Sequence, residues 1–147
     1  MMRRPHRRGV RVMTAQLAMW AAWSLALAAP LHAGEPPVTE DYVLHCSACH
    51  GPDGVGVPDR VPSLMATGEL ALQPGGREYL MRVPGAAQAP LSDERLARLL
   101  EWAVERFGGV RIEPPLSAEE VGLARRTPFR DPARARAAVM RGESKLD

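Results

Sequence analysis

The chain has only two cysteines, and both lie in one five-residue segment, Cys46-Ser47-Ala48-Cys49-His50. Residues three apart lie on one face of a helical turn, so the two sulfurs can reach the two vinyl groups on one edge of a porphyrin. The histidine that follows then places its imidazole under the iron. This segment therefore predicts covalent attachment of one haem c through Cys46 and Cys49, with His50 as an iron ligand.

Three other kinds of chemistry use a cysteine pair. A redox dithiol of the thioredoxin type requires a strand before the motif and a βαβ pattern around it, and neither is visible. A structural disulfide suits an oxidising compartment, but its two-residue loop would be short and strained. A zinc site needs more ligands, and His45 and His50 without a second cysteine pair form a poor set. Haem attachment remains the favoured prediction.

The N-terminal segment has the order of a secretory leader. Residues 3–11 carry five arginines and no acid, and an uncharged, mostly apolar stretch follows from Met13 to Leu31. This order predicts a signal peptide over residues 1–33, cleaved after Ala33, and export to the periplasm. An uncleaved anchor is the alternative, and only in that case would the protein be held at a membrane.

Removing the leader changes the charge of the chain. The whole sequence has a net charge of +2, but residues 1–33 hold five of the 19 basic residues and none of the 17 acidic ones. The exported part is left with 14 bases and 17 acids, a net charge of −3. The positive charge thus belongs to the leader and gives no support for nucleic-acid binding.

Further pieces around the cysteine motif fall in a familiar order. They are Tyr42, the glycine-rich loop 51–56, Pro62 twelve residues after His50, Leu64, and the segment Leu91-Ser92-Asp93-Glu94. With them, the chain resembles the class I cytochrome c family over about residues 38–108. The resemblance implies an all-α fold whose N- and C-terminal helices cross around one haem, with Tyr42 and Trp102 in contact at the crossing.

The same resemblance assigns roles beside the haem. The backbone carbonyl of Pro62 would accept a hydrogen bond from Nδ1 of His50, and Leu64 would pack against the haem. Such a bond orients the ligand and raises its basicity.

The sixth iron ligand departs from the family pattern. Many members carry a methionine in the loop before the final helix, but residues 83–90 contain none. Met65, Met81 and Met140 are the candidates in the exported part, and each also suits a core position. We predict Met81, because it lies nearest to that loop. A vacant position, a water molecule or another group stays open, whereas His45 adjoins the motif and cannot easily reach the opposite face.

Local patterns predict several helices and no strands. Thr39 suits the cap of a first helix from Glu40 to about Ala48, and residues 51–68 are typical of a loop. A final helix follows the cap residue Ser92 and stops at Gly108-Gly109. Its apolar positions recur every three or four residues; they are Leu96, Leu99, Leu100, Ala103, Val104 and Phe107.

These boundaries predict a cytochrome c domain over residues 34–110 and an extension over 111–147. The extension is expected to form two short helices or to be partly disordered. Ser117 with Glu120 fits a capping box, and Asp131-Pro132 suits the start of a helix over Ala133–Met140.

The predicted function is single-electron transfer in the periplasm rather than enzymatic catalysis. The protein would act as a soluble carrier or as the small cytochrome subunit of a dehydrogenase, and its partners would be a dehydrogenase, an oxidase or another cytochrome. A haem-based ligand binder or sensor with an open or weakly filled sixth position is the alternative. A thiol oxidoreductase without haem is a third, less favoured hypothesis.

Overall fold

The computed structural model describes residues 35–146. The predicted signal peptide, residues 1–33, lies outside the described residues. The described residues from Pro36 onward form one compact unit, and no helix among them is long and apolar enough to cross a membrane.

The described residues confirm the all-α prediction. Their only β-type pairing is an isolated bridge between Val57 and Val61. The elements in chain order are α2 (Val38–His45), α3 (Ser47–His50), the 3-10 turn η1 (Leu64–Ala66), α4 (Thr67–Ala71), α5 (Gly76–Arg82), α6 (Pro84–Ala87), α7 (Asp93–Gly108), α8 (Ala118–Ala124) and α9 (Pro132–Met140).

Helix α7 organises the packing. The Ser92 hydroxyl caps its first turn by accepting a hydrogen bond from the Arg95 amide (3.3 Å), and Gly109 ends it in the left-handed conformation with φ 70°. Its apolar stripe buries Leu96, Leu99 and Val104 almost completely. Because apolar positions recur at helical spacing, this one face can pack against α2 and α4 together.

The first helix differs from the prediction in its bounds. It begins at Val38 after Pro37, without the expected side-chain cap from Thr39. At Cys46 the backbone departs from helical geometry (φ −125°), and a separate turn, α3, carries the rest of the motif. The expected loop is also shorter, because η1 begins at Leu64.

Helices α2 and α7 meet through an aromatic cluster. The Tyr42 ring lies 5.3 Å from that of Trp102 and 5.1 Å from that of Phe107, between centroids. The predicted contact between Tyr42 and Trp102 is therefore present. A second link is the fully buried Asp41 carboxylate, which accepts hydrogen bonds from the Arg95 guanidinium.

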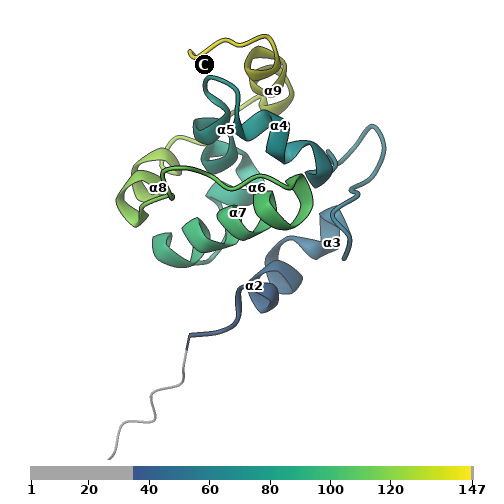
Figure 1. The fold of residues 1–147 in the computed structure, drawn as a ribbon, viewed down its shortest axis with the longest axis vertical. Coiled ribbons are helices and arrows are strands. Elements are labelled where there is room, and N and C mark those ends of the chain that lie inside the picture. Colours follow the sequence, from purple (N-terminus) through teal and green to yellow (C-terminus); the bar gives the residue numbers. More distant parts are fainter. Residues whose placement is uncertain (1–34, 147) are drawn as a thin grey trace, which may run out of the picture. The chain divides into compact units, whose positions relative to one another are not determined.

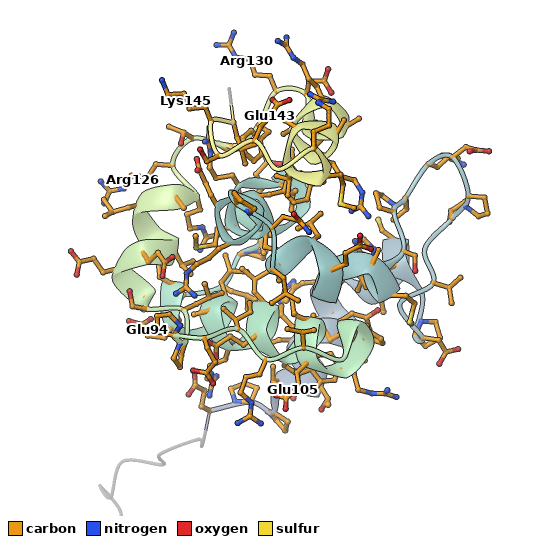
Figure 2. All side chains as sticks on the ribbon, turned by 45° about the horizontal axis from the view of Figure 1, so that its top comes forward. Glu94, Glu105, Arg126, Arg130, Glu143 and Lys145 are labelled. Atoms are coloured by element: carbon orange, nitrogen blue, oxygen red, sulfur yellow. The ribbon has the colours of Figure 1, made fainter. Side chains whose placement is uncertain are left out.

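The segment after residue 110 packs into the same core. Helices α8 and α9 correspond to the two helices expected there, and Figure 1 shows α4 and α5 between α7 and α9. Val121, Phe129, Ala135 and Val139 are buried together with the residues of α5 and α7. Three charged side chains of this segment, those of Arg126, Arg130 and Lys145, point outward in Figure 2.

Candidate functional site

The cysteine motif forms a single exposed helical turn. The Cys46 carbonyl accepts hydrogen bonds from the amides of Cys49 (3.2 Å) and His50 (3.0 Å), so the two thiols project from one turn. Both are free thiols; Cys46 is half-buried and Cys49 is exposed. A turn of this kind offers two nucleophilic sulfurs and one imidazole to the same external group.

The imidazole of His50 is held by the following loop. Its Nδ1 lies 3.1 Å from the backbone oxygen of Pro62, twelve residues further along the chain. A carbonyl oxygen can only accept, so Nδ1 carries the proton of the neutral ring and Nε2 keeps its lone pair. The contact expected from the resemblance is thus present in the structure, and its role beside a metal stays a prediction.

Several short bonds hold this loop against the helices. The Tyr42 hydroxyl donates to the Gly51 carbonyl (2.5 Å), and the Leu64 amide donates to the Gly54 carbonyl (2.7 Å). Gly54 has φ 71°, and a Cβ atom there would stand 2.7 Å from the Phe107 ring. Only glycine allows this close approach, so Gly54 lets the loop lie on the aromatic cluster.

Burial shapes the protonation of the site. Desolvation by burial raises the pKa of the Cys46 thiol to about 11, with further contributions from the negative charges of Asp41 and Cys49. Burial also lowers the pKa of His50, opposed by the hydrogen bond to Pro62. Neutral imidazole is the form that binds metals, and a protonated Cys46 does not fit a redox dithiol, whose reactive cysteine has a lowered pKa.

The alternative uses of the motif find no support in the described residues. A thioredoxin-type site lies beside a sheet, whereas this part of the chain has no strand. Cys46 and Cys49 are not joined in a disulfide. No cluster of three or more histidine, cysteine or acidic side chains that could hold a metal ion occurs within residues 35–146.

The remaining predicted site residues lie in different environments. Leu64, at the start of η1, is half-buried and packs against the core. Met81, on α5, is only 3% exposed and belongs to the core cluster, whereas Met65 and Met140 are 48% and 41% exposed. The assignment of Met81 as an iron ligand stays a prediction.

The structure adds residues that the motif search did not find. An open pocket of about 450 Å³ lies between the loop after α3, from Val55 to Ser63, and Ala133 at the start of α9. Val55 and Val57 on this loop are 61% and 42% exposed. The sequence around Ala133 gives no local signal that this alanine lines a pocket, because only the tertiary fold brings α9 to the loop.

The donor set and its surroundings fit a covalently held haem. Two free thiols and an imidazole with an available Nε2 lie on one turn, and the adjoining loop carries two exposed apolar side chains, Val55 and Val57. No protein-family model matches this chain, and searches of curated proteins and of solved structures found no match either.

Proposed function

We propose that the domain binds one haem c covalently through Cys46 and Cys49, with Nε2 of His50 as an axial iron ligand, and that it transfers single electrons. The observation that carries the proposal is the hydrogen bond between Nδ1 of His50 and the Pro62 carbonyl. It holds the imidazole in the tautomer that a metal ligand needs, and such partners orient ligating histidines in metal sites generally.

Each residue of the candidate site has a defined part in this proposal. The haem, once bound, supplies the redox chemistry. Cys46 and Cys49 would anchor it by two thioether bonds, His50 would bind the iron, and Pro62 would orient His50. Leu64 and the exposed valines of the loop would shield the ring from water. Met81 is the sequence-based prediction for the second axial ligand, and histidine–methionine ligation gives a relatively high potential.

The proposed setting is the periplasm, with other redox proteins as partners. The protein would be a soluble carrier or the small cytochrome subunit of a dehydrogenase. Encounters between electron-transfer proteins bury little surface and are short-lived. A single haem near an exposed turn suits such encounters, because Cys49 is already at the protein surface.

Haem attachment is tested by producing the chain with its leader in a periplasm that contains the haem-maturation machinery. We expect Soret absorption, the mass increment of one haem, and a potentiometric titration that follows a one-electron curve. The variant Cys46→Ser combined with Cys49→Ser should lose the covalent increment. His45→Ala is the matched control for His50→Ala, because His45 lies at the end of α2, next to the same turn. A colourless wild-type protein refutes the proposal.

A second candidate function is a haem-based ligand binder or sensor. It is favoured by the absence of methionine from residues 83–90 and by the burial of Met81 in the core, because together they leave the sixth position without an evident ligand. Carbon monoxide separates the two functions. Rapid, tight binding to the reduced protein indicates the binder, and resistance indicates the carrier.

A further inference from the structure

An open recess of about 610 Å³ lies where the chain enters α9. It is lined by residues 127–131 together with Arg82 and Arg134. None of these residues belongs to the candidate haem site, and three of them are arginines. Pockets of about 300–1,000 Å³ are typical of small-molecule sites. The recess is therefore a second candidate binding site, and its arginines indicate an anionic ligand.

Arg82 forms a fixed wall of the recess. Its side chain is only 17% exposed. Its Nε donates to the Thr127 carbonyl (2.8 Å), and its Nη1 donates to the Glu78 carboxylate and to the Leu146 carbonyl (3.3 Å). The guanidinium lies over the Phe129 ring, 4.1 Å from its centroid. These contacts hold the positive charge in place, and no group within residues 35–146 accepts a hydrogen bond from the remaining nitrogen, Nη2.

Arg130 and Arg134 bring two unpaired charges to the same recess. Both residues are exposed, and neither guanidinium takes part in an ion pair with another of the described residues. The Arg134 amide donates to the Asp131 carboxylate (2.9 Å), which caps α9. Because Asp131 already satisfies the start of this helix, the arginine side chains, and not the helix end, are the free donors.

The charge around the recess favours an anion with more than one negative charge. Three guanidinium groups and the Asp131 carboxylate give the lining a formal net charge of +2. Residues 126–146 hold six basic and two acidic side chains, whereas residues 35–110 hold six basic and 11 acidic ones. Figure 2 shows Arg130 and Lys145 at one end of the molecule, and Glu94 and Glu105 toward the other. A field of this kind raises the concentration of anions near the recess.

The donors suit a phosphate group better than a carboxylate. A guanidinium presents its N–H groups in a planar fork that can bind two oxygens of either anion. One fork uses both oxygens of a carboxylate, whereas a terminal phosphate group has three oxygens and up to two negative charges. Two or three arginines can therefore share one phosphate group, and a recess of this size has room for a second one linked to it.

We propose that this recess binds a terminal phosphate group, with Arg130 and Arg134 as its main donors and Arg82 as the fixed positive wall. The group would belong to a soluble phosphate compound or to a lipid headgroup. Binding would draw the two free arginine side chains over the anion without breaking any protein contact. The site lies apart from the cysteine turn and gives the C-terminal extension a binding role that does not depend on haem.

The test is isothermal titration calorimetry of the full exported chain with sodium diphosphate. We expect saturable binding of one diphosphate per chain, weaker at high salt because the donors are exposed. Arg130→Ala combined with Arg134→Ala should weaken binding by at least about tenfold. Arg126→Ala combined with Lys145→Ala is the matched control, because it removes the same charge from the extension but no residue of the recess. It should weaken binding by less than about threefold.

A third variant separates the shape of the donors from their charge. Arg130→Lys combined with Arg134→Lys keeps both charges but loses the planar forks, so it too should weaken diphosphate binding. Circular dichroism verifies that each variant folds. A titration that does not saturate, or equal weakening in the alanine pair and its matched control, indicates only a solvated basic surface and overturns the proposal. Citrate that binds more tightly than diphosphate overturns the assignment of phosphate.

Co-sedimentation with vesicles distinguishes the two sources of the phosphate group. Wild type and the alanine pair are mixed with phosphatidylcholine vesicles that contain or lack phosphatidic acid. Diphosphate binding without sedimentation identifies a soluble compound, and sedimentation that the alanine pair loses identifies the headgroup. Sedimentation that the alanine pair keeps overturns the headgroup as the source. Neither measurement depends on haem colour, so these outcomes are distinguishable from failure of the proposed function.

Discussion

Arg125 is expected to be the most important polar side chain for the stability of the domain. It follows α8, and its guanidinium donates to the carbonyls of Ala87 (2.9 Å) and Leu91 (2.9 Å), to that of Ala89, and to the Asp93 carboxylate (3.1 Å). The Arg125 side chain is only 17% exposed. One residue of the extension thus satisfies four acceptors on the stretch from the end of α6 to the start of α7.

The substitution Arg125→Ala removes all of these donors at once. A hydrogen bond to a charged group contributes about 1.5–3 kcal/mol, and the contributions of one side chain are not additive. The Asp93 carboxylate is 42% exposed and adds little, so we expect a loss of about 2–4 kcal/mol in the free energy of unfolding, mainly from the backbone carbonyls left without a donor. For a domain of this size, a loss of 3 kcal/mol lowers the Tm by roughly 10 °C.

The assay is denaturant and thermal unfolding of the matured protein followed by circular dichroism. Arg126→Ala is the matched control, because Arg126 is the next residue and points outward in Figure 2; it should change the stability by less than about 0.5 kcal/mol. Arg125→Lys keeps the charge but not the planar set of donors, so it should recover only part of the loss. Equal stabilities of Arg125→Ala and Arg126→Ala would refute the assigned role.

Three further perturbations test other parts of the packing. Gly68→Ala should destabilise the domain by about 1–3 kcal/mol in denaturant unfolding, because the new Cβ atom would stand 2.1 Å from the Gly108 carbonyl oxygen. Alanine normally favours a helix, so the loss would come from this contact. Gly85→Ala is the control and should not be destabilising, because no atom lies within 4 Å of a Cβ at that position. Asp41→Asn should cost about 3 kcal/mol in the same assay, since it turns a fully buried charged partner of Arg95 into a neutral one, and a loss below 0.5 kcal/mol would contradict the importance of this pair. The hydrogen bond from Arg77 lowers the pKa of Glu120 below its usual 4.5, so the pair stabilises the fold above that pH and its contribution is lost as the pH falls through the lowered pKa. The stability difference between wild type and Glu120→Gln should be under about 1 kcal/mol for this partly exposed pair, present at neutral pH and smaller in acid. A difference that grows in acid would speak against this linkage.

The features that the sequence predicted well are those that depend on residues close in the chain. The cysteine turn needs only Cys46 to His50, and the caps at Ser92, Ser117 and Asp131 need only the next three residues. The stripe of α7 is a local period. The predicted capping box at Ser117 is also present, because the Ser117 hydroxyl accepts from the Glu120 amide and the Glu120 carboxylate interacts with the Ser117 backbone. The local pattern did not predict that the same carboxylate also bonds Arg77.

The tertiary structure alone decided the features that join distant segments. The sequence pattern also missed one local feature, the break between α2 and α3 at Cys46, because the spacing of apolar residues does not show that one φ angle leaves helical geometry. Arg125 reaches back 32 to 38 residues to its acceptors, and Ala133 meets a loop some 70 residues earlier in the chain. Composition and spacing determine which side chains are available for chemistry; packing between helices determines which of them remain uncovered, because burial depends on neighbours that no local period specifies. For this reason the sequence predicted the turn from Cys46 to His50, whereas the burial of Met81 and the arginine-lined recess before α9 emerged only from the fold.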